Sequence, residues 1–132
     1  MELIKKLIFT TLIISGFSFV QNVAVAQIPE QILTSLKNGD SKELAEYFNQ
    51  NVELVVLESD NVYSKSQAQQ IVGKFFTSNT PESFSVIHQG GKEGAKYVIG
   101  NLKANTGNFR VYFLLKTSSG KDYIHQLRIE KQ

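Results

Sequence analysis

The chain has 132 residues, with 14 lysine and arginine residues against 12 aspartate and glutamate residues, and no cysteine. This length fits one domain with a single hydrophobic core. The net charge of +2 and the lack of a basic run argue against a nucleic-acid-binding protein, because such proteins gain affinity by neutralising phosphates. The absence of cysteine also excludes disulfides, so the core must stabilise the fold without cross-links.

The first 26 residues have the composition of a secretory signal peptide. Lys5 and Lys6 give a basic start, the apolar stretch 7–20 follows, and Ala24-Val25-Ala26 offers a small-residue cleavage site. The apolar stretch is shorter than the about 20 residues of a membrane-spanning helix, which favours a signal peptide over a transmembrane anchor.

We therefore expect residues 1–26 to be removed and residues 27–132 to form a single mature domain that begins at Gln27. Its net charge is about +1, because the removed segment carries two lysines and one glutamate. The signal predicts export, to the periplasm or out of the cell, with no membrane span left in the mature protein.

Two short helices are expected at the start of the mature chain. Pro29 suits a first helical turn, and one apolar stripe follows it, made of Ile28, Ile32, Leu33 and Leu36. Gly39 ends this helix as a C-cap. Asp40 then caps the second helix, with Glu43 completing a capping box. The buried stripe of the second helix is predicted to be Leu44, Ala45 and Phe48.

A strand, a short returning strand and a long helix are expected next. The Val-rich stretch 52–58 reads as a strand, and Val62-Tyr63 as its short partner. Ser64 and Gln67 form a capping box before a helix over residues 65–77. The apolar positions of this helix form a wide face suited to a sheet: Ala68, Ile71, Val72, Phe75 and Phe76.

Four strands complete the chain, at 83–89, 96–104, 108–117 and 121–130, joined by turns that contain glycine. Side chains alternate between the two faces of a strand. The alternation predicts one face with Phe109, Val111, Phe113 and Leu115, and another with Arg110, Tyr112, Leu114 and Lys116. It also places Phe84, Val86 and His88 together, opposite Ile87, and groups Tyr123, His125, Leu127 and Ile129.

The stretch 36–48, which ends one helix at Gly39-Asp40 and the next at Phe48, leads into Val52-Glu53-Leu54. This order resembles the opening of the nuclear transport factor 2-like superfamily, and the helix around Phe75-Phe76 is similar to the third helix of that fold. Length, signal and strand pattern further resemble a family of small secreted bacterial proteins known only as a domain of unknown function. The resemblance implies an α+β cone, a strongly bent, mainly antiparallel sheet wrapped around the long helix with two shorter N-terminal helices.

Enzymes of this superfamily, such as ketosteroid isomerases and related dehydratases, place a carboxylate or a histidine inside the cone as a base. Here each candidate carboxylate has another explanation as a cap, a turn residue or a strand residue away from the inward face: Asp40, Asp60, Asp122, Glu53 and Glu58. We therefore predict no catalytic residue and no cofactor. Two histidines without a third ligand also fall short of a zinc site, so we predict no metal.

Two sets of residues remain as candidates for binding. His88, Tyr97, Tyr123 and His125 are predicted to line a small-molecule pocket inside the cone, or else to be part-buried residues with ordinary hydrogen bonds. On the opposite face, apolar groups alternate with polar ones, which indicates a protein contact. The superfamily resemblance implies a homodimer through this face, which we assign to Ile87, Arg110, Tyr112, Leu114 and Ile124.

These features favour a secreted, non-enzymatic module that dimerises through its sheet and binds a small ligand or a cell-envelope partner. The alternative is a pocket enzyme of the isomerase or dehydratase kind that uses His88 or His125 as acid and base. A subunit that works only in assembly with another envelope protein is a third possibility, which no residue distinguishes.

Overall fold

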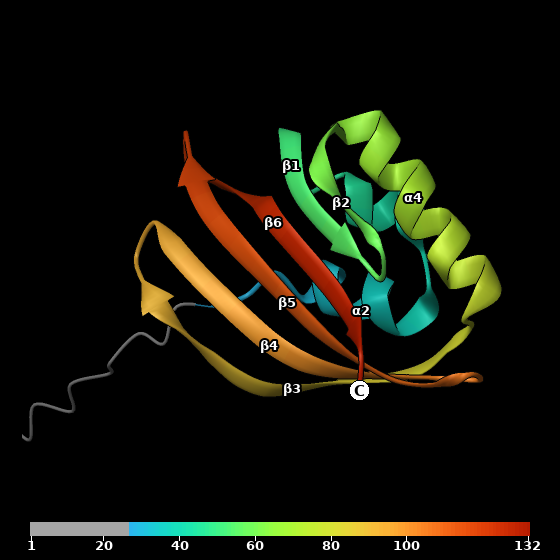
Figure 1. Cartoon of the computed structure of the whole chain (residues 1–132). Helices are drawn as coiled ribbons and strands as arrows, with labels where there is room; N and C mark the ends of the chain where they lie inside the picture. The colour runs from blue at the N-terminus through green and yellow to red at the C-terminus, as the bar shows by residue number, and fades with distance from the viewer. Residues whose placement is uncertain (1–26) are drawn as a thin grey trace, which may run out of the picture.

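The computed structural model describes residues 27–132 (Figure 1). The signal peptide expected at residues 1–26 lies outside this range. In chain order the elements are α2 Glu30–Asn38, α3 Ser41–Ala45, β1 Phe48–Val56, β2 Ser59–Ser64, α4 Lys65–Ser78, β3 Pro81–Lys92, β4 Ala95–Ala104, β5 Gly107–Ser118 and β6 Lys121–Lys131. No helix in this range is both long and apolar enough to cross a membrane.

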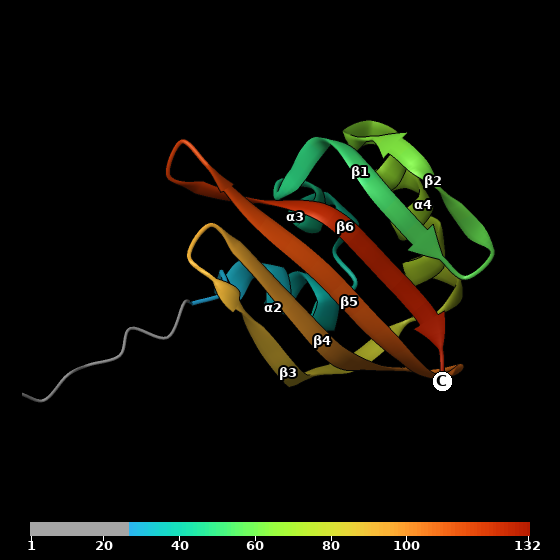
Figure 2. The same ribbon diagram turned by 60° about the vertical axis from the view of Figure 1, so that its left-hand side comes forward.

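The six strands form one sheet in the order β2-β1-β6-β5-β4-β3. All neighbours run antiparallel except β1 and β6, which are parallel. The sheet bends, and the helices lie behind it in Figure 2, all on one side. We call the helix-covered side the inner face and the opposite side the outer face. The α+β class and the mainly antiparallel sheet are as predicted.

The helix boundaries follow from local capping. Gly39 adopts the left-handed conformation at φ 66°, which ends α2. The Asp40 carboxylate accepts a hydrogen bond from the Glu43 backbone N–H at 3.0 Å and starts α3. Ser64 and Gln67 form the predicted capping box at the start of α4. Phe48, by contrast, begins β1 and does not belong to the helix before it.

The inner face is filled by hydrocarbon. Strands β4, β5 and β6 bury their inward side chains almost completely, and the apolar stripes of the helices pack against them. Phe75 of α4 meets Phe109 of β5 edge to face, with ring centroids 5.0 Å apart. The predicted inward row of β5 is confirmed: Phe109, Val111, Phe113 and Leu115 are all buried.

Two β-bulges change which side chains share a face. Val86 pairs with Gly100 and His88 with Ile99, so Ile87 is an extra residue in β3. Leu114 pairs with Gln126 and Leu115 with Ile124, so His125 is an extra residue in β6. One inserted residue moves every later side chain to the other face.

The bulges correct three predicted placements. His88 lies outward, in register with Ile99, and no longer shares a face with Phe84. Ile124 is fully buried in the core, so it is not part of the outer face to which the sequence assigned it. Tyr123 pairs with the outward Lys116, opposite in face to Leu127.

Candidate functional site

The outer face consists of two parallel rows of side chains that cross all six strands. From β2 to β3, the first row is Asp60, Val55, Arg128, Tyr112, Ile99 and His88. The second row is Val62, Glu53, Gln126, Leu114, Tyr97 and Gly90. The charged and amide side chains of both rows lie on β2, β1 and β6, together with Val55 and Val62, whereas β5, β4 and β3 contribute mainly aromatic and apolar side chains. We call the two parts the polar half and the aromatic half, the latter made of His88, Tyr97, Ile99, Tyr112 and Leu114.

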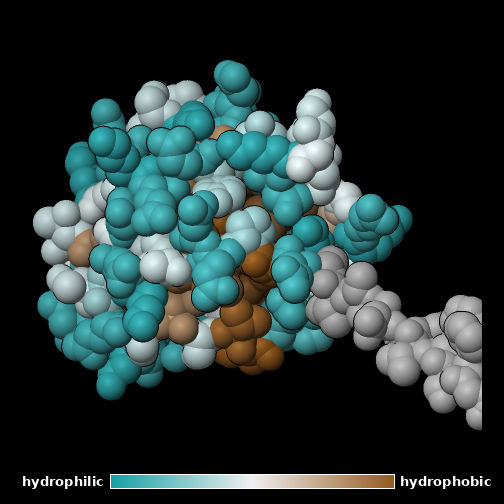
Figure 3. Space-filling model, turned by 180° about the vertical axis from the view of Figure 1, so that it is seen from behind, coloured by the Kyte–Doolittle hydropathy of each residue, from teal (hydrophilic) through white to brown (hydrophobic). Residues whose placement is uncertain are grey.

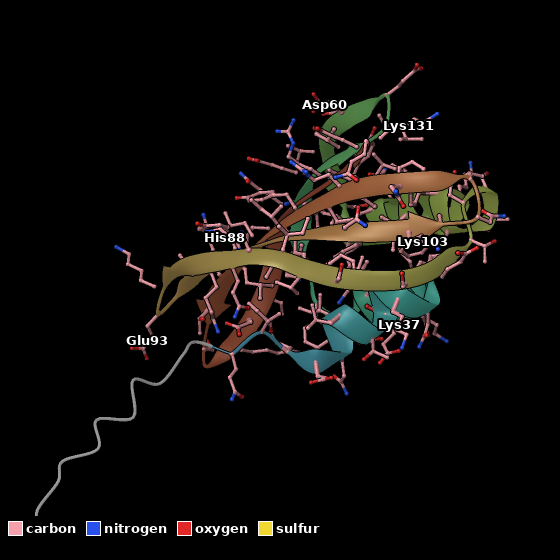
Figure 4. The ribbon with its side chains drawn as sticks, turned by 90° about the horizontal axis from the view of Figure 1, so that it is seen from below. Lys37, Asp60, His88, Glu93, Lys103 and Lys131 are labelled. Carbon is pink, nitrogen blue, oxygen red and sulfur yellow. The ribbon has the colours of Figure 1, made fainter. Side chains whose placement is uncertain are left out.

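The aromatic half is ordered by contacts among its own rings. Tyr97 stacks on Tyr112 with ring centroids 6.4 Å apart. The Tyr97 hydroxyl lies 3.1 Å from Nε2 of His88, within hydrogen-bond distance. In Figure 4 His88 lies on the side of β3 that faces away from α2, the helix that carries Lys37. His88 is exposed, so its hydrogen bond with Tyr97 stands at the surface and not inside the cone.

Gly90 explains why Tyr97 can lie across β3. A Cβ atom at Gly90 would stand 2.6 Å from the Tyr97 hydroxyl oxygen, closer than such atoms come in folded proteins. The ring therefore covers the glycine of the neighbouring strand, an arrangement known to protect glycines in sheets. The strand predicted over residues 83–89 left Gly90 in the turn that follows, whereas Gly90 lies within β3. A glycine directly opposite an aromatic residue was the signal that would have identified this contact.

The polar half surrounds an open cleft of about 420 Å³, lined by Glu53, Val55, Asp60, Asn61, Val62, Gln126 and Arg128. The Gln126 amide donates to the Glu53 carboxylate at 2.6 Å. The Arg128 guanidinium pairs with Glu130 at 3.0 Å. These bonds hold the charged groups next to the sheet, and they separate the aromatic half from the β2 edge.

The predicted pocket residues do not come together. His88 and Tyr97 meet in the aromatic half. His125 lies at the β6 bulge, where burial and the Lys116 ammonium lower its pKa while Glu53 opposes the shift. Tyr123 lines a separate cleft near the turn between β5 and β6.

The predicted dimer residues lie largely on the outer face. Tyr112 and Leu114 are half-buried members of the aromatic half, and Arg110 stands next to them on β5. Ile87 is 57% exposed at the β3 bulge. Since His88 and Tyr97 lie on this face as well, part of the predicted pocket set shares one surface with part of the predicted dimer set.

Other parts of the described surface give weaker indications of a binding site. The side seen from behind is mostly hydrophilic, with one hydrophobic patch (Figure 3). Within residues 27–132, no group of three or more histidine, aspartate or glutamate side chains is arranged to hold a metal ion. The arrangement of the aromatic half suits contact with another apolar surface better than acid–base chemistry, because His88 faces a phenol at the surface and no carboxylate.

The fold of residues 27–132, a bent sheet with three helices on one face, is that of the nuclear transport factor 2-like class. A designed protein with nuclear transport factor 2 in its name shares this fold at a TM-score of 0.61 and 16% identity, over 76% of this chain and 90% of that chain. At this identity the likeness shows the fold alone.

The family itself is shown by closer matches. Residues 29–130 match the profile of the family described as a domain of unknown function, DUF4783. A family member from Bacteroides ovatus is 38% identical, with a TM-score of 0.76 over 80% of this chain and 96% of that chain. One from Bacteroides fragilis is 31% identical, with the same TM-score, over 80% and 100% of the two chains. The chain belongs to this family. No curated protein matched it.

Proposed function

We propose that the mature domain is an exported, non-enzymatic binding module that associates with a second copy of itself through the aromatic half of the outer face. The observation that carries the proposal is the row structure of that face. Tyr97, Ile99, Tyr112 and Leu114 stand side by side on β4 and β5, and no described helix covers them. An apolar centre with a polar rim is the usual anatomy of a protein contact.

The same surface supports a two-fold contact. Rigid tyrosine rings contribute large contact areas at low entropic cost and are enriched at interface centres. Arg110 and the polar half supply charged groups around the rings, as an interface rim requires.

The proposal moves ligand binding away from the centre of the cone. The inward residues of β4 to β6 and the apolar residues of α4 are buried together in one core. Any small ligand is therefore assigned to a surface cleft. The alternative of acid–base catalysis has no support in the described residues. His88 faces outward on β3 and His125 lies at the bulge in β6, so the two histidines do not share a site.

Sedimentation velocity over a concentration series tests the proposal. We expect wild type to form dimers and Leu114→Glu to remain monomeric, because the substitution places a charge in the middle of the apolar rows. Val62→Glu is the matched control, since Val62 lies in the same row but in the polar half and is 58% exposed. It should leave the dimer intact. A wild-type monomer at every concentration would overturn the proposal.

A further inference from the structure

A second cleft, at the turn between β5 and β6, has a different chemistry. It has a volume of about 400 Å³ and is lined by Glu46, Phe48, Asn49, Gln50, Lys65, Ser118, Lys121 and Tyr123. We propose that this cleft binds a small organic anion, a carboxylate or phosphate monoester carried on a hydroxyl-bearing body. This proposal concerns a different set of residues from those of the proposed dimer contact, and it does not depend on self-association.

The charges of the cleft are the first argument. Lys65 and Lys121 both line it, and neither forms an ion pair within residues 27–132. The Lys121 ammonium lies 5.4 Å from the centre of the Tyr123 ring, which holds it by a cation–π contact on the wall of the cleft. Glu46 is the only acidic group among the lining residues. Two unpaired ammonium groups beside one carboxylate favour an anionic ligand.

The remaining polar groups suit hydroxyls. Asn49, Gln50, Ser118 and the Tyr123 phenol each can donate and accept hydrogen bonds. The Asn49 amide is fixed by donating to the Asn51 backbone carbonyl at 3.2 Å. Phe48, which is almost fully buried, also lines the cleft. The volume is near the lower end of the about 300–1,000 Å³ range of ligand sites, so a ligand of monosaccharide size fits best.

The backbone explains why a cleft exists at this place. β1 and β6 pair at Phe48 with Ile124 and again from Glu53 with Gln126, with a break in register between these pairs. Residues 49–52 therefore bend away from β6 and open space beside the β5–β6 turn. The Ile124 N–H donates to the Tyr47 carbonyl at 2.6 Å, which fixes one side of the opening. Such irregularities in a strand are over-represented next to functional sites.

Titrations followed by amide NMR test the proposal, with glucuronate, glycerol phosphate, glucose and inorganic phosphate as probes. We expect the two organic anions to shift the amide signals of Asn49, Gln50, Ser118 and Lys121, and the tighter of the two identifies the anionic group. Glucose should have no effect, since it lacks the charge, and inorganic phosphate should bind at least about tenfold more weakly, since it lacks the hydroxyl-bearing body.

A pair of double variants separates a site from general attraction. Lys65→Gln with Lys121→Gln should weaken binding of the organic anions at least about tenfold. Lys103→Gln with Lys131→Gln removes the same charge from two other exposed positions and should leave the affinity unchanged. Three results would overturn the proposal: an equal loss of affinity in the two double variants, amide signal shifts at lysines throughout the domain, or glucose binding as tight as that of the organic anions. Leu114→Glu should still bind the anion, even where self-association has failed.

Discussion

The two faces of the sheet differ in how their side chains are satisfied. On the inner face, residues from β4, β5 and β6 are buried against helices in one continuous core. On the outer face, Tyr97, Ile99, Tyr112 and Leu114 are half-buried next to one another, and no described helix covers them. The core on the inner face thus stabilises the fold, whereas the outer face is left open to contact with other molecules.

Strand alternation and the bulges, and not the chemical type of a residue, decide which face the residue occupies. Leu114 and Leu115 are adjacent and chemically identical, yet Leu115 is fully buried and Leu114 is not. The bulge at His125 likewise sends Ile124 inward and Gln126 outward.

The largest effect is expected from Ile124→Lys. It would bury an ammonium group in the core without a partner and lower the free energy of unfolding by about 4 kcal/mol or more. Tyr123→Lys, one residue earlier and outward, should cost about 1 kcal/mol or less. Urea denaturation of both variants measures the difference. Equal losses would mean that the bulge at His125 is misplaced.

Next in size is the comparison of Leu115→Ala with Leu114→Ala. We expect Leu115→Ala to lower the free energy of unfolding by about 3 kcal/mol, because it opens a cavity in the core. Leu114→Ala should cost about 1 kcal/mol when measured in dilute solution, where association does not contribute. If Leu114→Ala lowers the free energy of unfolding as much as Leu115→Ala in dilute solution, Leu114 is buried in the core and the outer face is not open to solvent.

An intermediate effect is expected at the ion pair of Lys96 and Asp122, which stand 3.0 Å apart with side chains only 12% and 15% exposed. Burial alone would raise the pKa of Asp122, but the hydrogen bonds from Thr117 and Lys96 and the charge of Lys96 together lower it. The ionised carboxylate therefore stabilises the fold above its unfolded pKa of about 3.9, and this contribution is lost as the pH falls through the folded-state pKa.

We expect Asp122→Asn to cost about 1–3 kcal/mol at neutral pH and progressively less below about pH 4. Thr117→Val keeps the carboxylate and should show a smaller loss with the same pH trend. The measurement is the free energy of unfolding between pH 7 and pH 2. A loss for Asp122→Asn that does not change with pH would exclude the ionised carboxylate as its cause.

The smallest effect concerns the pKa of His125. Burial first and the Lys116 ammonium second lower this pKa, and Glu53 opposes them. Lys116→Gln should therefore raise the pKa of His125, and Glu53→Gln should lower it further, while Lys116→Arg keeps the charge and serves as the control. An NMR titration of the imidazole measures each shift. Because the folded-state pKa is the lower one, stability should decline as the pH falls below about 6.5.

If neither Lys116→Gln nor Glu53→Gln moves the pKa of His125, the imidazole does not lie near these two side chains. The orientation of His125 at the β6 bulge would then be wrong.

The sequence predicted the local structure well. Periodicity and capping residues identified the three helices within the described chain, and simple alternation found the buried row of β5. These features depend on residues close together in the chain, so a local pattern contains the necessary information.

The faces of β3 and β6 were harder to predict. An extra residue such as Ile87 or His125 leaves no mark on composition, and only the pairing with a neighbouring strand identifies it. The same reason explains why His88 was expected inside the cone and Ile124 outside. The second cleft depends on the parallel pairing of β1 with β6, which joins the two ends of the domain and has no local signal.

The most direct test of the open outer face is hydroxyl-radical footprinting of the wild-type protein at low and high concentration. We predict that Tyr97 and Tyr112 are oxidised in dilute solution and become protected as the concentration rises. Tyr63, which packs against the core from β2, is the internal reference and should not change. Protection that is absent at every concentration, or that spares Tyr97 and Tyr112, would contradict the account.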